Sequence, residues 1–258
     1  MGFFQTSGIL NQRGFFGGGI AFKPSDIAGL QLWLDATTGL FDATSGGSAV
    51  TTDGSAVARW EDQSGNGRHF KQATSNNRPV LKASIQNNKN IIRFDGSNDF
   101  LEMDTAFSGL TSASYYVVLK VDADPPTVQT MTGHPVFFLS GTSLASHFPW
   151  TDGNIYDNTL TTSRKTVGNP TRSLALFNLY NVDSTSGHWT SRLNKSQLFT
   201  TSTNTIDQQG KKLGLNDSQT TFYYFDGDMA EVICFNSILS ASDRGKIEDY
   251  LYAKWNIQ

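Results

Sequence analysis

The sequence contains one cysteine among its 258 residues, so it has no internal disulfide framework. That residue, Cys234, lies in an apolar run, where we expect a buried structural thiol. Basic residues never form a cluster of more than two neighbours, and the formal net charge is -3, which argues against nucleic-acid binding. No apolar run approaches the roughly 18 residues that span a bilayer, so we expect no membrane insertion.

Several motifs of cofactor chemistry and catalysis are also missing. The sequence has no Gly-x-x-x-x-Gly-Lys-Ser/Thr phosphate loop and no Gly-x-Ser-x-Gly elbow that would position a nucleophilic serine. Its four histidines lack the spacing of metal ligands; they are His69, His134, His147 and His188. The segment Met1–Gln5 has neither the basic nor the continuous apolar region of a signal peptide, so we expect a protein that needs no export signal.

Aromatic residues are frequent, with 18 Phe, 8 Tyr and 5 Trp, as is typical of a folded domain. Short apolar or alternating runs are separated by polar turns, which predicts an all-β sandwich or barrel. The predicted strands are Leu30–Leu34, Ile91–Phe94, Phe100–Met103, Tyr115–Val121, Ser173–Tyr180, Leu193–Thr200, Lys212–Leu215 and Met229–Phe235. The turn-rich segment Asp95–Asp99 is interpreted as a hairpin connection, and Tyr115–Val121 as a central strand.

One helix is predicted near the C-terminus. Ser240 and Asp243 form a Ser-x-x-Asp start of the capping-box kind. Ile247, Leu251 and Trp255 then recur at a spacing of four residues and give the helix one apolar face. We expect this face to close the sandwich.

Residues 1–24 form a separate Gly-rich zone, and residues 25–258 form the β domain. A Gly-rich stretch has too much backbone entropy to fold alone, yet this one carries large apolar side chains. They are Phe3, Phe4, Ile9, Leu10, Phe15 and Phe16. We interpret the zone as an arm that becomes ordered on a partner surface; the alternative is a loose terminus whose Phe residues pack on its own domain.

Six segments occur in the order found in one known superfamily. They are Gly29–Ala36, Trp60–His69, Asn76–Pro79, Ile92–Gly96, Phe225–Ile233 and Ile247–Trp255. On these segments the chain resembles the concanavalin A-like lectin/glucanase superfamily, in its laminin-G-like form. The resemblance implies a two-sheet antiparallel jelly-roll sandwich with a short C-terminal helix. It does not settle function, because the fold carries lectins, hydrolases, adhesins and virion domains.

Structural roles are expected for the most distinctive polar residues of these segments. Asp62 and the Ser-Gly-Asn-Gly sequence that follows it should hold a loop through Asx-type hydrogen bonds. Asp95–Gly96 and Asp226–Gly227 should form turns. Glu231 lies between apolar residues of a strand, where a paired scaffold carboxylate is favoured over a catalytic one.

Retaining glycosidases of this superfamily use the pattern Glu-x-Asp-x-x-Glu, because two carboxylates about 5 Å apart must flank one bond. The four glutamates never adopt that spacing; they are Glu61, Glu102, Glu231 and Glu248. The closest approach, Glu102-Met103-Asp104, lacks the second glutamate. We therefore predict no enzyme and no catalytic residue.

The cofactor prediction is none, with calcium as the one alternative. Calcium needs six or more oxygen donors, which loops rich in Asp and Asn supply. The candidate donors are Asp152, Asn154, Asp157 and Asn158 in one segment and Asp95, Asn98 and Asp99 in another. Such turns are also common without metal.

Glycan binding requires an exposed aromatic ring beside amide and carboxylate groups. The segment Phe148–Tyr156 has that composition, and His188–Trp189 is a second candidate. The predicted contacts are Trp150, Asp152, Asn154, Tyr156 and Trp189. The alternative is that these aromatic residues belong to the core.

Two functions follow from these observations. The first is a non-enzymatic virion structural protein of a phage, made in the host cytoplasm: a capsid-decorating, head-fibre or tail-associated protein, present in many copies or as a homo-oligomer. Its arm would bind other virion proteins. The second is a carbohydrate-binding lectin or adhesion module that recognises surface glycans of the host.

Overall fold

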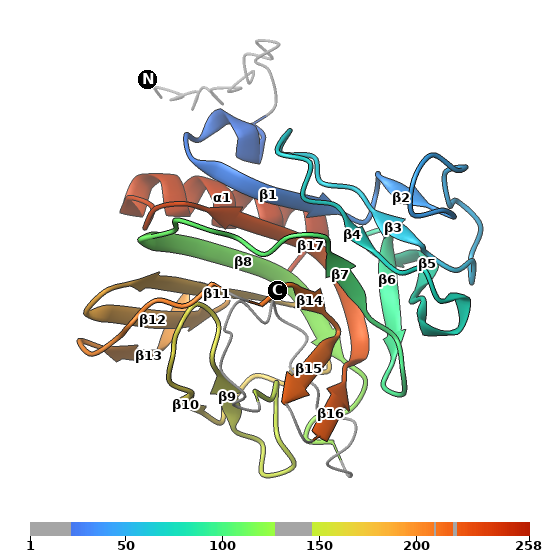
Figure 1. The fold of residues 1–258 in the computed structure, drawn as a ribbon. Helices are drawn as coiled ribbons and strands as arrows, with labels where there is room; N and C mark the ends of the chain where they lie inside the picture. The colour runs from blue at the N-terminus through green and yellow to red at the C-terminus, as the bar shows by residue number, and fades with distance from the viewer. Residues whose placement is uncertain (1–21, 127–145, 209, 219–220) are drawn as a thin grey trace, which may run out of the picture.

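The computed structural model describes residues 22–126, 146–208, 210–218 and 221–258. Its larger sheet is antiparallel and has eight strands (Figure 1). They are β1 (Leu30–Asp35), β5 (Val80–Gln86), β6 (Lys89–Asp95), β8 (Ser112–Val121), β11 (Asn178–Thr185), β12 (His188–Leu193), β13 (Ser196–Thr201) and β17 (Asp226–Phe235). The order is β13-β12-β11-β8-β17-β6-β5, and β1 also pairs with β17. One edge of β17 is thus shared: its first residues pair with β6 and its later residues with β1.

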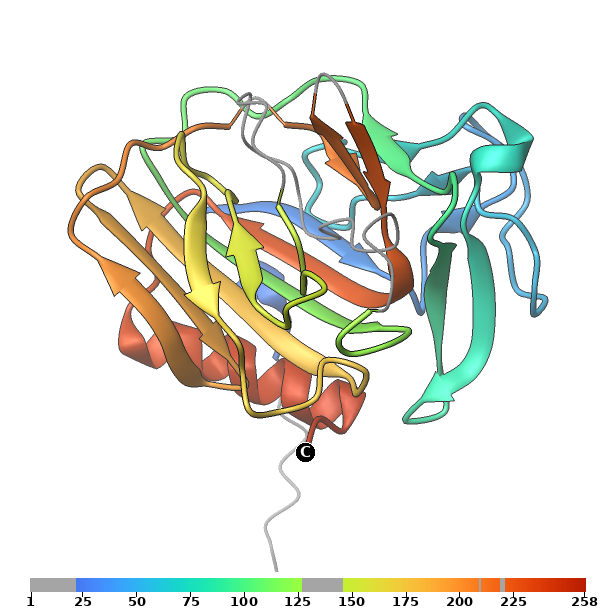
Figure 2. The same cartoon turned by 90° about the horizontal axis from the view of Figure 1, so that it is seen from below.

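A second antiparallel sheet has five short strands in the order β14-β7-β4-β3-β2. They are β2 (Leu40–Phe41), β3 (Arg59–Trp60), β4 (Phe70–Lys71), β7 (Leu101–Met103) and β14 (Lys212–Leu213). Two further strand pairs are β9 (Ile155–Asp157) with β10 (Lys165–Gly168), and β15 (Leu215–Ser218) with β16 (Thr221–Tyr224). Both pairs lie on the opposite side of the larger sheet from the helix (Figure 2). Two short 3-10 helices, η1 (Pro24–Asp26) and η2 (Ser75–Asn77), complete the described elements.

The larger sheet is buried on both faces, which explains the unbroken apolar sequence of β8. Tyr115, Val117 and Leu119 of β8 pack in the core shared with the second sheet, where Trp60 and Phe70 are fully buried. Tyr116 and Val118 point the other way, toward the helix α1 (Ala241–Trp255). Alternate residues of a strand face opposite sides, so a strand covered twice needs apolar residues throughout. The prediction of a central strand is confirmed.

The helix begins and packs as its sequence predicts. The Ser240 side chain accepts a hydrogen bond from the Asp243 backbone N–H at 3.1 Å. Ile247, Leu251 and Trp255 are buried against the larger sheet. The helix does not lie between the sheets: it covers the face of the larger sheet that the second sheet leaves open. Within the described residues, no helix is long and apolar enough to cross a membrane.

The loop after β3 is held by one carboxylate, as predicted. Asp62 accepts hydrogen bonds from the backbone N–H groups of Trp33, Ser64 and Arg68, at 2.9 to 3.0 Å. The amide of Asn66 donates to the carbonyl of Leu30 at 3.0 Å. The Ser-Gly-Asn-Gly sequence therefore ties this loop to β1 and has a structural role.

Several local predictions are wrong. The strand predicted at 193–200 is interrupted by the turn between β12 and β13, and the strand predicted at 212–215 is divided between β14 and β15. Asp95 does begin a turn, but the strands on either side of it, β6 and β7, belong to different sheets, so the segment is no hairpin. Asp226 and Gly227 are strand residues of β17, where a Cβ at position 227 would lie 2.2 Å from the Lys120 carbonyl oxygen. The strand predicted at 173–180 begins only at Asn178, because the preceding residues form a turn.

The chain is therefore an all-β antiparallel sandwich with a short C-terminal helix. The single thiol is buried in its core, which raises the pKa of Cys234 to about 12 and makes it unreactive. The arm residues Phe3, Phe4, Ile9, Leu10, Phe15 and Phe16 lie outside the described residues. Phe22 is described, and its ring packs edge-on against Tyr250 of α1 at 6.0 Å.

Candidate functional site

A pocket with aromatic walls lies beside β9 and has a volume of about 330 Å³. Its lining residues, called here the aromatic pocket, are His147, Trp150, Asp152, Tyr156, Arg164 and Tyr223. They come from the segment before β9, from β9 itself, from the residue that precedes β10 and from β16. The volume is at the lower end of the roughly 300–1,000 Å³ of small-ligand sites.

The rings of the aromatic pocket pack on one another. The centroids of His147 and Trp150 are 3.9 Å apart. Tyr223 presents an edge to both, at 5.0 Å from His147 and 5.8 Å from Trp150. Edge-to-face contacts of this kind fix ring orientation, so the walls of the pocket are preformed.

The backbone brings these side chains together through a turn and a bridge. The Trp150 N–H donates to the Asn154 carbonyl and the Gly153 N–H to the Trp150 carbonyl, at 2.8 and 2.9 Å. His147 and Tyr156 exchange two backbone hydrogen bonds at 2.8 and 2.9 Å. The turn between them therefore folds back beside β9 and places Trp150 and Asp152 next to Tyr156.

Asp152 and Arg164 supply charge on either side of the Tyr156 ring. The Tyr156 hydroxyl donates to Asp152 at 2.8 Å, and the Arg164 guanidinium lies over the ring at 4.9 Å. Desolvation alone would raise the pKa of Asp152, but the hydrogen bonds from Asn154 and Tyr156 outweigh it and lower that pKa. The bond to Asp152, and then desolvation, raise the pKa of Tyr156. Asp152 is thus an ionised acceptor and Tyr156 a neutral donor.

Such an arrangement suits a sugar ring. Aromatic faces cover the apolar side of a pyranose or furanose, while ionised and neutral polar groups bond its hydroxyls. Trp150, Tyr156 and Tyr223 are partly exposed, so a ligand has access to them. The aromatic pocket is the candidate functional site.

Three of the five predicted glycan contacts line the aromatic pocket: Trp150, Asp152 and Tyr156. Asn154 does not line it; its backbone closes the turn behind Trp150 and donates to Asp152 at 2.8 Å. The prediction for Trp189 is wrong. Its side chain is 0% exposed, and its indole N–H donates to the Thr159 carbonyl at 2.9 Å. Trp189 is a core residue, so no glycan reaches it.

Sequence reasoning missed three residues of the aromatic pocket. His147 is close to the predicted segment and could have been found by extending it by one residue. Arg164 becomes a neighbour because β10 pairs with β9. Tyr223 gave no local signal, since it belongs to β16 and reaches the pocket only through the tertiary fold.

Three of the candidate calcium donors, Asp95, Asp157 and Asn158, have partners within the protein. Asp157 accepts from Tyr180 and from the Thr159 N–H, both at 2.6 Å, and Asn158 is hydrogen-bonded to Ser146. Asp95 accepts from three backbone N–H groups, at Ser97, Asn98 and Asp99. Among the described residues, no group of three or more His, Cys, Asp or Glu side chains is arranged to hold a metal ion. These turns have structural roles.

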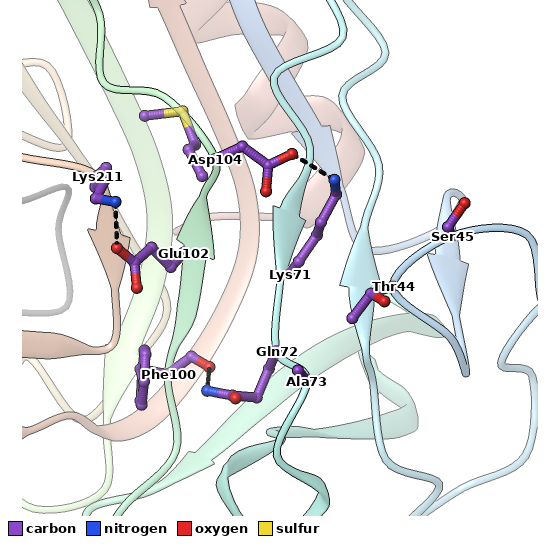
Figure 3. A pocket seen from close by; sticks show the side chains of 10 residues that line it. Thr44, Ser45, Lys71, Gln72, Ala73, Phe100, Glu102, Asp104 and Lys211 are labelled. Atoms are coloured by element: carbon purple, nitrogen blue, oxygen red, sulfur yellow. Dashed lines mark hydrogen bonds and ion pairs between the residues drawn. The ribbon is translucent and has the colours of Figure 1, made fainter.

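A larger groove of about 630 Å³ crosses the second sheet (Figure 3). Two ion pairs line it: Lys71 with Asp104 at 2.5 Å, and Lys211 with Glu102 at 2.7 Å. Glu102 and Asp104 are the carboxylates nearest to the glycosidase pattern. Each makes an ion pair with its own lysine, and neither belongs to a Glu-x-Asp-x-x-Glu pattern.

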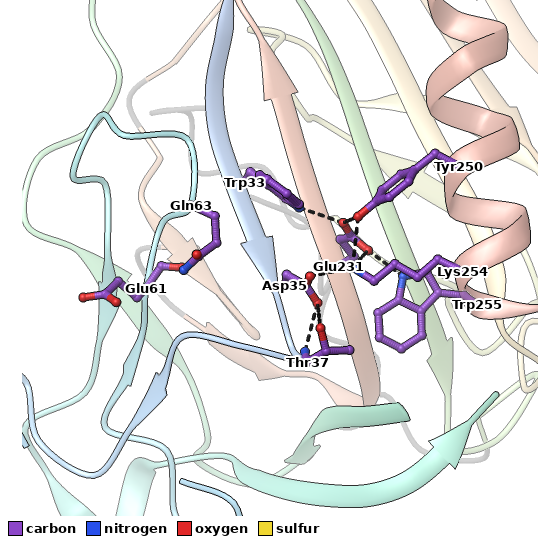
Figure 4. Close-up of polar contacts among 9 residues, drawn as sticks. All are labelled: Trp33, Asp35, Thr37, Glu61, Gln63, Glu231, Tyr250, Lys254 and Trp255. Atoms are coloured by element: carbon purple, nitrogen blue, oxygen red, sulfur yellow. Dashed lines mark hydrogen bonds and ion pairs between the residues drawn. The ribbon is translucent and has the colours of Figure 1, made fainter. Parts of the chain in front are cut away.

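A second group of Trp, Tyr and carboxylate side chains lies between β17 and α1 (Figure 4). Its members, called here the closed cluster, are Trp33, Asp35, Glu231, Tyr250, Lys254 and Trp255. Glu231 is 1% exposed and accepts from Trp33, Trp255 and Tyr250 at 2.6 to 2.8 Å. Lys254 bridges Glu231 and Asp35 at 2.8 and 2.5 Å. Glu231 is therefore a paired scaffold carboxylate, as predicted, and the closed cluster fastens α1 to the sheet.

No protein-family model and no curated protein matches the sequence. Solved structures do resemble the fold. A Trypanosoma rangeli sialidase in complex with 2,3-difluoro-KDN is similar over 88% of this chain and 33% of its own, with a TM-score of 0.59 and 13% identity. The binding domain of Paraclostridial Mosquitocidal Protein 1 is similar over 88% of this chain and 53% of its own, with a TM-score of 0.56 and 10% identity.

An arabinofuranosidase complexed with arabinofuranosyl-alpha-1,2-xylobiose has a TM-score of 0.51 and 14% identity, over 78% of this chain and 51% of its own. This chain thus spans between a third and about half of the length of these proteins. At such low identity the likeness establishes the β-sandwich fold alone.

Proposed function

We propose that this chain is a carbohydrate-binding module that holds a sugar in the aromatic pocket and does not cleave it. The observation that carries the proposal is the convergence of Trp150, Tyr156 and Tyr223 on a cavity of about 330 Å³ that also contains Asp152 and Arg164. A sugar uses both kinds of group, because one face of its ring is apolar and its edge carries hydroxyls. Two of the similar structures contain sugar ligands, which is consistent with the proposal.

Binding without cleavage is supported by the chemistry of the aromatic pocket. Glycosidases use two carboxylates or, in sialidases, a tyrosine nucleophile. Asp152 is the one carboxylate among the described residues that line the pocket. The bond to Asp152 raises the pKa of Tyr156, so its hydroxyl keeps its proton and acts as a hydrogen-bond donor.

A glycan array with the full chain tests the proposal. We expect binding to at least one class of polysaccharide, and loss of that binding in Trp150→Ala. Phe100→Ala is the matched control, because Phe100 is a partly exposed aromatic residue of the other groove. Equal binding by Trp150→Ala and the wild type would place the glycan elsewhere, and release of sugar from a bound polysaccharide would overturn the non-enzymatic half.

We also infer that the sandwich is the jelly roll of the concanavalin A-like superfamily. The ordered segments between Gly29 and Trp255 support this assignment, and two of them, the loop around Asp62 and the helix after Ser240, have the structural roles that the resemblance implies. An experimental structure with parallel strand pairs in either sheet would contradict it.

A setting on a virus particle is the second candidate function, favoured by the Gly- and Phe-rich composition of residues 1–24. In this setting the arm binds other virion proteins and the sandwich displays its sugar-binding pocket outward. The contact of Phe22 with Tyr250 is the point where the arm joins the domain. Deletion of residues 1–20 should leave a folded domain that no longer joins particles; incorporation of the truncated chain would reject this role of the arm.

A further inference from the structure

Lys165, the first residue of β10, is a buried cation that makes no ion pair with any described carboxylate. The residue is 8% exposed. The ammonium donates to the Ser163 hydroxyl at 2.9 Å and to the Thr203 carbonyl at 3.3 Å. In the described part of the chain no carboxylate lies within 4.0 Å of this nitrogen.

The nearest carboxylate in the strand ladder is committed elsewhere. Asp157 is opposite Lys165 in the pairing of β9 with β10. It accepts hydrogen bonds from Tyr180 and Thr159 and makes no ion pair with Lys165. A buried, unpaired ammonium is costly, and desolvation lowers the pKa of Lys165 accordingly. The hydrogen bonds to Ser163 and Thr203 offset part of the desolvation cost of the ammonium. A bound anion would offset the rest.

Both partners of Lys165 line a separate pocket of about 450 Å³. Its lining, called here the hydroxyl pocket, consists of Thr162, Ser163, Ser186, Gly187, Thr203, Asn204 and Thr205. No acidic side chain is among these residues, so nothing in the described wall repels an anion. The Ser163 hydroxyl accepts from Lys165 and keeps its own hydrogen to donate into the pocket. Lys165 itself does not line the pocket, but its ammonium donates to the Ser163 hydroxyl at 2.9 Å and places a positive charge directly behind that hydroxyl.

We propose that the hydroxyl pocket binds a small oxyanion, the carboxylate or sulfate group of an acidic sugar, through the Ser163 hydroxyl with the Lys165 charge directly behind it. The site is distinct from the aromatic pocket. Arg164, the neighbour of Lys165, lines the aromatic pocket, and the two pockets share no lining residue. The segment at the start of β10 thus lies between the aromatic pocket and the proposed anion-binding site.

Binding to the full chain is measured by NMR titration with sodium glucuronate, with glucose as its neutral counterpart, and with sodium sulfate. We expect glucuronate or sulfate, and not glucose, to shift the amide signals of residues 162–163 and 203–205. A stronger response to glucuronate assigns a carboxylate ligand, and a stronger response to sulfate assigns a sulfate ligand. Lys165→Met should weaken the binding about tenfold or more, as expected when the positive charge behind the Ser163 hydroxyl is lost.

Two further variants keep the test decisive. Ser163→Ala removes an exposed hydroxyl without disturbing the core, and it should also weaken anion binding. Trp150→Ala should leave anion binding unchanged, which separates this proposal from the proposed function. Lys165→Met should fold, because an apolar side chain of similar size replaces an unpaired buried charge. Equal shifts with glucose, or unchanged binding in Lys165→Met and Ser163→Ala, would overturn the proposal.

Discussion

The closed cluster and the aromatic pocket are built from the same kinds of residue. Each combines tryptophan, tyrosine, a carboxylate and a cation. In the closed cluster the carboxylate, Glu231, is surrounded on all sides: two indole N–H groups, a tyrosine hydroxyl and Lys254 all donate to it. In the aromatic pocket the carboxylate, Asp152, is exposed and accepts from one tyrosine and one backbone N–H.

The comparison shows that residue types alone do not distinguish a structural cluster from a binding site. What distinguishes them is whether the polar groups already have all their hydrogen-bond partners within the protein. Every polar group around Glu231 already has its partner within the protein, so the closed cluster has nothing to offer a ligand. Asp152 keeps acceptor capacity, and the rings around it are only partly covered. The same chemistry thus stabilises the fold in one place and is available for recognition in the other.

Removal of the central carboxylate should have the largest effect. Glu231→Ala leaves Lys254, Trp33 and Trp255 with buried donors and no acceptor, so we expect the free energy of unfolding to fall by about 3–5 kcal/mol. Urea denaturation measures the change. Asp249→Ala is the control: it breaks the exposed ion pair with Lys195 and should cost about 0–1 kcal/mol. Equal losses in the two variants would mean that the closed cluster does not fasten the helix.

The two tryptophans of the glycan prediction extend the comparison. Trp189→Ala opens a cavity in the core, and the free energy of unfolding should fall by about 3 kcal/mol or more. Trp150→Ala removes a partly exposed ring, so its cost should be about 1 kcal/mol, while sugar binding is lost. Thermal unfolding and glycan binding, measured side by side, separate the two. If Trp150→Ala unfolds as readily as Trp189→Ala, Trp150 is a core residue and not a binding platform.

Much of the scaffold can be predicted from sequence because its signals are local. The helix cap at Ser240 and the loop around Asp62 depend on hydrogen bonds that span few residues of chain. The pairing of Glu231 can also be predicted, because a carboxylate buried between apolar strand residues needs a partner. The identity of that partner is not needed for the prediction. The apolar run of β8 likewise predicts burial on both faces.

Exposure could not be predicted, because it depends on which element covers which. Trp150 and Trp189 have comparable neighbours in the sequence, but Trp189 is fully buried and donates to the Thr159 carbonyl, while the turn before β9 leaves Trp150 partly exposed. Tyr223 belongs to β16, which is distant in sequence from the other residues of the aromatic pocket. The hairpin predicted at Asp95 is wrong because local turn chemistry does not determine whether the next strand stays in the same sheet.

The smallest effects concern protons, and here the two regions should differ in sign. Burial, with the nearby charge of Asp35, raises the pKa of Glu231 above its ordinary 4.5. Asp152 has a pKa lowered below 3.8, because its hydrogen bonds outweigh desolvation. A carboxyl that holds its proton more tightly in the folded state makes the protein less stable as pH rises through the raised value. A carboxyl that releases its proton more readily adds stability above its unfolded pKa, and that contribution is lost as pH falls through the lowered value.

The unfolding free energy of the wild type should therefore approach that of Glu231→Gln as pH rises above 4.5. The small difference between the wild type and Asp152→Asn should instead vanish as pH falls below 3.8. Because Asp152 is exposed, carbon NMR titration of its carboxyl is the sensitive measurement, and the midpoint should lie below that of an ordinary aspartate. A midpoint above the ordinary value would show that the hydrogen bonds from Tyr156 and Asn154 do not form in solution. The aromatic pocket would then lack the ionised acceptor on which its recognition of hydroxyl groups depends.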